Sequence, residues 1–376
     1  ITKVATACAT AIHSKRNWIV LVILSIGMFG AMAYYDAPGA LAVWLSDDLN
    51  IKPTKLGLLY SAYSGPTIIF ALFCGYLLDK FGISVFLCIY QFLTVVAAGM
   101  LAFSYSRPEG IAFIIMIVSR AIGGISGDGL AIASRRAVFL WFDEKNQSLA
   151  MTLIISLPFL GTQYSFLALP WIANRLGGQA GFWSVFIICC VCAATVIFYI
   201  IICKKWPSEW EPVCDKSNEP ELSWCEQFRR TLKSLSWRFW ILVLSDVCVQ
   251  GVLWPFVAFS PEFFYHHYNL SPEIAGVYAT ILAGMAIPFG IIIGYIGRKC
   301  PKPIIGMFSG FLQIFCFFIL AWCTNIPPII GTLGLGFVLG SIGTFAYAPV
   351  SLIIPNENLG MALGILKSCE SISWLI

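Results

Sequence analysis

Residues 75–82 read Gly-Tyr-Leu-Leu-Asp-Lys-Phe-Gly, and this stretch decides the fold of the chain. It joins two apolar runs, 57–78 and 84–104, which are each long enough to cross a bilayer as a helix. Gly75 has no Cβ, so a neighbouring helix can approach it closely. Asp79 lies near the start of the second helix, where the helix dipole favours a carboxylate. The pattern Gly-x-Leu-x-Asp-x-x-Gly therefore indicates a close contact between helices next to a functional carboxylate. A polar turn without such a role is the alternative.

Asp79 could also hold a basic residue of another helix in one conformation and release it in another. Two arginines, Arg135 and Arg136, follow a later apolar run that ends on the same side of the membrane. We expect Asp79 to pair with Arg135 or Arg136 at the cytoplasmic ends of the second and fourth spans. Gly75 and Gly82 complete this predicted conformational latch, which is closed in the outward-facing state and breaks on inward opening.

Residues 294–299 form a second, degenerate copy of the stretch, which reads Gly-Tyr-Ile-Gly-Arg-Lys. Arg298 stands there at the position that corresponds to Asp79. Gly75 and Gly294 are 219 residues apart. Three further identities share that offset, namely Pro53 with Pro272, Gly57 with Gly276 and Tyr76 with Tyr295. The common offset predicts a duplicated unit, and two parallel repeats are an architecture of membrane transporters.

The composition points to a membrane protein with many spans. Of the 376 residues, 59% are hydrophobic and 11% are charged, whereas soluble domains carry roughly 25% charge. The lipid bilayer is therefore an expected partner. The net charge of +4 is spread over the loops, so we expect no nucleic-acid partner. We also expect no enzyme, no metal and no cofactor, because no catalytic nucleophile, metal cluster or phosphate loop stands out in the sequence.

The apolar runs predict eleven spans, most of them longer than the roughly 20 residues that a membrane helix needs. They fall near 18–45, 57–78, 84–104, 111–134, 149–173, 182–203, 239–260, 274–297, 303–323, 327–354 and 359–376. We expect an all-α membrane protein in which 1–203 form a six-helix bundle, 204–238 a central cytoplasmic linker with a short surface helix, and 239–376 an incomplete second bundle. A twelfth span, missing from this chain, would complete two sets of six.

The basic residues predict the orientation. The N-terminal segment and the even-numbered loops hold seventeen of the 23 lysines and arginines, and the odd-numbered loops hold four. Because cytoplasmic loops carry an excess of Lys and Arg, this bias predicts a cytoplasmic N-terminus.

Charged residues inside the predicted spans are the main functional signal. Each costs roughly 3 kcal/mol at the bilayer centre, so each should face a water-filled cavity or another charge. A buried structural ion pair is the alternative for any one of them. The six residues are Asp36, Arg120, Asp128, Asp246, Lys367 and Glu370.

Two kinds of resemblance sharpen the interpretation. Residues 75–82 resemble the signature of the major facilitator superfamily, which implies two parallel six-helix repeats. Four further stretches are similar to the lysosomal dipeptide transporter branch of that superfamily, in the same order over nearly the whole chain. They are 34–41 (Tyr-Tyr-Asp-Ala-Pro-Gly-Ala-Leu), 127–133 (Gly-Asp-Gly-Leu-Ala-Ile-Ala), 234–240 (Ser-Leu-Ser-Trp-Arg-Phe-Trp) and 354–364 (Ile-Pro-Asn-Glu-Asn-Leu-Gly-Met-Ala-Leu-Gly).

The resemblance implies uniport of dipeptides out of an acidic lumen, in the lysosome or another endomembrane. It also implies a glycosylated accessory membrane subunit, and an acidic residue at Asp128 that contacts the substrate. There are two departures from the family pattern. The family has Glu where Asp128 stands, and its animal members carry Arg where Phe159 stands here. Arg120 or Lys367 could replace that missing cation.

We therefore expect a central solute site between the two halves, in which acids bind a substrate ammonium and a cation binds a carboxylate. Arg120 and Asp128 are eight residues apart and share one broad helix face. Lys367 and Glu370 are three apart and could instead pair with each other. The predicted site residues are Asp36, Arg120, Asp128, Lys367 and Glu370, with apolar walls from Tyr34, Tyr35 and Trp254.

Two alternatives stay open at this stage. The first is an ion-coupled carrier of amino acids or organic anions. The second is a membrane sensor or scaffold that kept the fold without transporting.

Overall fold

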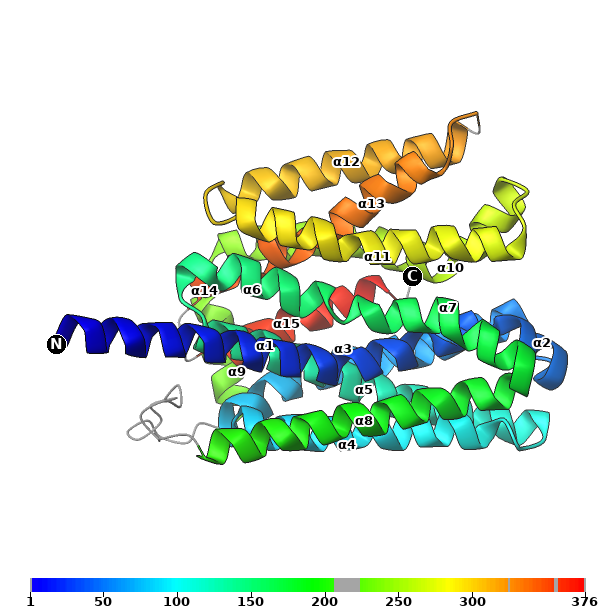
Figure 1. The fold of residues 1–376 in the computed structure, drawn as a ribbon, viewed down its shortest axis with the longest axis horizontal. Helices are drawn as coiled ribbons and strands as arrows, with labels where there is room; N and C mark the ends of the chain where they lie inside the picture. The colour runs from blue at the N-terminus through cyan, green and yellow to red at the C-terminus, as the bar shows by residue number, and fades with distance from the viewer. Residues whose placement is uncertain (1, 206–223, 324, 355–357, 375–376) are drawn as a thin grey trace.

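The computed structural model describes residues 2–205, 224–323, 325–354 and 358–374. Within these ranges every regular element is helical, and the long helices run side by side (Figure 1). This confirms the predicted all-α class. The N-terminal half contains α1 (Thr2–Ala40), α2 (Ala42–Leu49), α3 (Pro53–Phe81), α4 (Ile83–Ser104), α5 (Glu109–Trp141), α6 (Glu144–Ser156), α7 (Phe159–Leu176) and α8 (Gly178–Lys205).

The C-terminal half follows a short helix, α9 (Trp224–Ser234), which belongs to the predicted linker. Residues 206–223 of that linker lie outside the described residues. The half itself contains α10 (Trp237–His267), α11 (Pro272–Ile296), α12 (Lys302–Trp322), α13 (Ile329–Ile342), the π-helical segment η2 (Gly343–Tyr347), α14 (Val350–Ile353) and α15 (Leu359–Ser373).

Within the described ranges, ten helices or helix pairs are long and apolar enough to cross a membrane. Helix α15 corresponds to the eleventh predicted span and has 15 described residues. Large apolar side chains such as Phe311 and Ile314 are about 70% exposed, as residues that face lipid should be. Ten of the eleven predicted spans thus correspond to helical segments of membrane-spanning length.

Several boundaries differ from the sequence prediction, and we describe three of them. The polar lead 1–17 is already helical from Thr2 onwards, as part of α1. The fifth span is split into α6 and α7 at Pro158, because proline has no N–H to donate to the preceding turn. The fourth span does not end at residue 134, since α5 continues to Trp141 through buried apolar side chains. Arg135 and Arg136 therefore lie inside a helix and not in the loop after it.

The two halves meet most closely at the end of the bundle that carries α9, which we call the α9 end. A Cβ on Gly75 of α3 would lie 2.4 Å from the backbone oxygen of Gly360 in α15. A Cβ on Gly364 would lie 2.5 Å from the backbone oxygen of Ala71. Glycine is thus needed on both helices, because their backbones touch. The turn after α3 is closed by Gly82, whose φ of 81° suits glycine.

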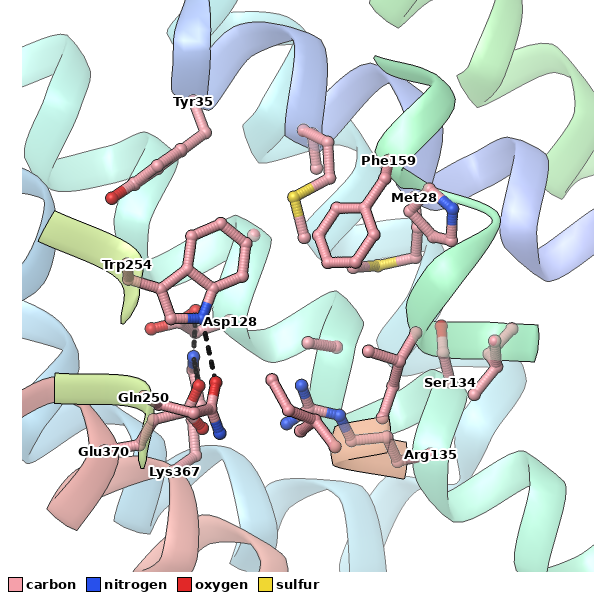
Figure 2. Close-up of a pocket in the computed structure, with 18 of the residues that line it drawn as sticks. Met28, Tyr35, Asp128, Ser134, Arg135, Phe159, Gln250, Trp254, Lys367 and Glu370 are labelled. Carbon is pink, nitrogen blue, oxygen red and sulfur yellow. Dashed lines mark hydrogen bonds and ion pairs between the residues drawn. The ribbon is translucent and has the colours of Figure 1, made fainter. Parts of the chain in front are cut away.

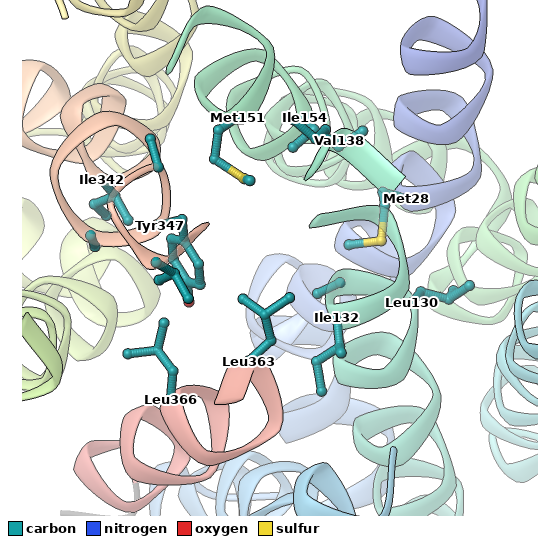
Figure 3. Close-up of a cluster of buried hydrophobic side chains, with 14 of the residues drawn as sticks. Met28, Leu130, Ile132, Val138, Met151, Ile154, Ile342, Tyr347, Leu363 and Leu366 are labelled. Carbon is teal, nitrogen blue, oxygen red and sulfur yellow. The ribbon is translucent and has the colours of Figure 1, made fainter. Parts of the chain in front are cut away.

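A second contact at the α9 end joins α6 to η2. A Cβ on Gly343 would lie 2.5 Å from the Cα of Thr152. The hydroxyls of Thr152 and Thr344 are hydrogen-bonded at 2.8 Å. Apolar side chains from both halves then pack into one buried cluster, in which Met28, Val138 and Met151 face Tyr347 and Leu363 (Figure 3). Close packing of these described residues therefore holds the halves together at this end.

Candidate functional site

A cavity lies between the two halves, next to the cluster of Figure 3. The N-terminal half contributes side chains from α1, α3, α5, α6 and α7, and the C-terminal half contributes α10, α13 and α15 (Figure 2). Its charged lining residues are Asp128, Arg135, Lys367 and Glu370. A polar cavity at the interface of two repeats is where membrane transporters bind their substrates.

Lys367 is held between two carboxylates. Its Nζ lies 3.2 Å from Oδ1 of Asp128 on α5 and 3.1 Å from Oε1 of Glu370 on its own helix. The hydroxyl of Tyr347 donates to the second oxygen of Glu370 at 2.6 Å. All of these side chains are buried. We call Asp128, Lys367 and Glu370 the acid–lysine cluster. With two acids and one lysine it carries a formal charge of −1, so it attracts a cation.

Arg135 lines the same cavity at a distance from the acid–lysine cluster (Figure 2). Its guanidinium lies 3.8 Å from the centre of the Tyr347 ring, in a cation–π contact. Among the described residues, no carboxylate forms an ion pair with Arg135. This position does not fit the predicted role of Arg135 in a latch after the fourth span. The physical reason is the longer α5, which carries Arg135 into the cavity wall.

Aromatic rings form the apolar wall of the cavity. Tyr35 and Tyr63 meet edge to face at 4.8 Å, and Trp254 lies 5.7 Å from Phe159 and 5.4 Å from Trp374. Tyr35 and Trp254 were predicted for this wall. No sequence pattern predicted that Tyr63 of α3 and Trp374, at the end of α15, would join them. Such a wall can contact apolar side chains of different shapes.

A chain of hydrogen bonds on α10 holds the Trp254 ring of this wall in place. The indole N–H of Trp254 donates to Oε1 of Gln250 at 2.8 Å, and Nε2 of Gln250 donates to Oδ1 of Asp246 at 2.6 Å. Asp246 itself is fully buried. The chain of hydrogen bonds fixes the Trp254 ring and gives the buried Asp246 a partner.

Arg120 is not among the residues that line this cavity, although it was predicted there. It is fully buried, and its guanidinium lies between 4.7 and 5.4 Å from the ring centres of Tyr34, Tyr35, Tyr60 and Tyr63. It donates to the backbone oxygens of Tyr34 and Leu59 at 3.1 and 3.3 Å. Arg120 therefore ties α5 to α1 and α3. The eight-residue spacing turns it about 80° away from Asp128, which is enough to leave the cavity.

Asp36 and Tyr34 also lie outside the cavity lining. Oδ2 of Asp36 accepts a hydrogen bond from Thr162 at 2.6 Å, so this buried acid joins α1 to α7. The Tyr34 hydroxyl pairs with Ser119 at 2.8 Å. Of the predicted site residues, the structure thus brings together Asp128, Lys367, Glu370, Tyr35 and Trp254, and it leaves Asp36, Arg120 and Tyr34 in the surrounding packing.

The side chain of Asp79 lies outside the described residues, so its predicted pairing stays a prediction. Arg136 is buried near the α9 end of α5 and remains its candidate partner. We expect Asp79→Asn to loosen this end, because even an ion pair worth under ~1 kcal/mol biases two nearly balanced conformations. The measurement is hydrogen–deuterium exchange of α3 and α15, with Asp47→Asn, an exposed acid at the opposite end, as control. Unchanged exchange and unchanged transport in Asp79→Asn would contradict the latch.

The fold and the cavity together define a class, namely a polytopic α-helical membrane protein with a charged cavity between two helix bundles. The sequence matches the Major Facilitator Superfamily over residues 18–376, and the chain belongs to this family of membrane transporters.

Comparisons with individual proteins agree with this assignment. The lysosomal dipeptide transporter MFSD1 of Bos taurus is 25% identical, over 96% of this chain and 77% of that protein. The probable galactarate/D-glucarate transporter GudP of Escherichia coli is 22% identical, over 96% of this chain and 85% of that protein. Among solved structures, the proton:xylose symporter XylE has a TM-score of 0.74 at 15% identity, over 96% of this chain and 87% of that one.

Proposed function

We propose that the protein moves small zwitterionic solutes across an endomembrane by alternating access, with dipeptides as its substrates. The observation that carries the proposal is the acid–lysine cluster, because it presents one net negative charge to a cavity between the two halves. A protonated amino group can take the place of Lys367 beside Asp128, while Lys367 keeps its contact with Glu370. The aromatic wall then accepts the side chains of the peptide.

The similarity to the lysosomal dipeptide transporters supports this substrate and a lysosomal location. We further propose uniport, driven by the solute gradient out of an acidic lumen, and a glycosylated accessory subunit as partner. The charge bias of the loops supports an orientation in which the α9 end faces the cytoplasm. In that orientation the closely packed α9 end is the cytoplasmic gate.

An ion-coupled carrier of organic anions is the second candidate. The likeness to the probable galactarate/D-glucarate transporter favours it, as does the presence of Arg135 in the cavity. Against it stands the buried acid–lysine cluster, because a dianion would meet its net negative charge. A zwitterion satisfies both the cluster and the arginine, which is why we favour it.

Flux measurements in proteoliposomes test the proposal. We expect the purified protein to speed the efflux of alanyl-leucine well above that of empty liposomes, and collapse of the pH gradient to leave this rate unchanged. Glucarate flux without alanyl-leucine flux would show that the organic-anion carrier is the better description. Dependence of the dipeptide rate on the pH gradient would contradict uniport, and flux of neither solute would favour a sensor or scaffold.

A further inference from the structure

The proposed function leaves open which group binds the carboxylate of a zwitterionic substrate. Two of the cations predicted for this task are already engaged. Lys367 is shared by two acids and also lies 3.9 Å from the centre of the Trp374 ring. Arg120 is fully buried among four tyrosines and donates to two backbone oxygens outside the cavity lining. Neither is placed to receive a solute carboxylate.

Arg135 is placed to do so. It is half-buried, lines the cavity, and has no ion-pair partner among the carboxylates of the described residues. The Tyr347 ring supports one face of its guanidinium at 3.8 Å. Stacking on a ring leaves the N–H groups at the edge of the guanidinium available, and these are the groups that bind a carboxylate in the plane.

The Tyr347 ring, on which Arg135 stacks, is itself fixed in position. Tyr347 is fully buried in η2, and its hydroxyl donates to Glu370 of the acid–lysine cluster at 2.6 Å. The ring that positions Arg135 is thus hydrogen-bonded to the group on the other side of the cavity. The two charged parts of the site are connected through one rigid side chain.

The spacing along α5 sets the distance between the two parts. Asp128 and Arg135 are seven residues apart, which places them about 20° apart around the helix and about 10 Å apart along it. They therefore belong to the same wall of the cavity. Because Arg side chains lean back toward the helix N-terminus, the gap between the charged groups is shorter than this rise. Two extended residues span about 7 Å, whereas the charges of a free amino acid flank a single carbon.

We propose that Arg135, held on Tyr347, binds the carboxylate of the substrate. It thereby selects solutes whose ammonium and carboxylate lie at the two ends of a dipeptide. This inference rests on the proposed function and adds the carboxylate subsite to it. Arg135 is accordingly a specificity-determining residue that touches substrate. The cavity then distinguishes substrates by the distance between their ammonium and their carboxylate, because Asp128 binds the first group and Arg135 the second.

The test compares alanyl-leucine with its C-terminal amide, which lacks only the carboxylate charge. For the wild-type protein we expect the acid to bind roughly tenfold to a hundredfold more tightly than the amide, because a charged hydrogen-bond partner is lost. Arg135→Gln should lower the affinity for the acid to that for the amide and leave the amide unchanged. The control is Arg298→Gln, which removes another tyrosine-stacked arginine that does not line the cavity. It should keep the wild-type preference.

Each result bears on one of the two proposals. If Arg135→Gln keeps the preference for the acid, the carboxylate subsite is wrong, although dipeptide transport would stand. If the wild type binds alanyl-leucine and its amide equally, the subsite is also wrong. If the wild type binds neither, both proposals fail. Should Arg135→Gln not purify as a monodisperse protein, Arg135→Lys replaces it, since it keeps the charge but loses the two-point grip. The preference should then fall several-fold.

Discussion

Asp128→Asn is expected to abolish measurable dipeptide binding while the protein stays folded and monodisperse. In the wild type, a substrate ammonium meets a buried carboxylate of the acid–lysine cluster. Asparagine has nearly the same shape but no charge, so the net charge of the cluster changes from −1 to zero. Removing one partner of a buried charge pair costs about 2–5 kcal/mol of binding free energy, which corresponds to an affinity roughly 30-fold lower or worse.

The fold should survive this change because Lys367 keeps a second partner. Glu370 lies 3.1 Å from Lys367 Nζ and is independent of Asp128. Ser371 can still donate to the side-chain oxygen at position 128. No unpaired charge is left in the interior, and an unpaired charge is the usual reason for a large loss of stability in such variants.

The measurement is a thermal shift with a panel of dipeptides and free amino acids, since binding to the folded state alone raises the melting temperature. The wild type should be stabilised by dipeptides in a dose-dependent way, and Asp128→Asn should not respond. The matched control is Glu262→Gln, an acid-to-amide change at an exposed position far from the cavity lining. Normal binding and transport by Asp128→Asn would remove the basis of the proposed site.

The fold was predictable because the length and hydropathy of an apolar run are enough to identify a membrane span. No partner helix has to be known before an apolar run of that length can be assigned. The boundary error that bears on the site occurred where a charge sits inside a helix. Because an arginine pair is typical of a loop, the sequence predicts that the fourth span ends before Arg135. The structure continues α5 past it, because Val138 and Trp141 are buried and Arg135 faces the cavity.

The site was harder to predict, since hydropathy does not show which way a helix is rotated. A charge inside a span must be buried, but it can be buried in a cavity, as Asp128 is, or among tyrosines, as Arg120 is. The tyrosines around Arg120 come from two other helices, and no local pattern predicts such a cage. The sequence does contain one signal for the site, namely the seven-residue spacing of Asp128 and Arg135, which places both on one face of α5.

Gly75→Val is expected to separate the two halves at the α9 end and to shift the protein away from the conformation described here. A Cβ at position 75 would lie 2.4 Å from the oxygen of Gly360 and 2.9 Å from the Cα of Met361. These are backbone atoms of α15, which cannot rotate away as a side chain can, so the helices must move apart. Overpacking of this kind costs typically 1–3 kcal/mol. A penalty near the middle of that range changes a two-state ratio roughly thirtyfold.

Hydrogen–deuterium exchange can follow this opening without any label. We expect faster exchange in 71–78 and 359–366 of Gly75→Val than in the wild type, together with slower transport, because a carrier that cannot close one side cannot complete its cycle. Gly57→Val is the matched control, since it makes the same change in the same helix at a position where nothing lies within 4 Å of the added Cβ. It introduces the same β-branched side chain in place of glycine in the same helix, so any difference between the variants reports on the contact with α15. Equal exchange and equal transport in the two variants would show that the packing of α3 against α15 does not control the gate.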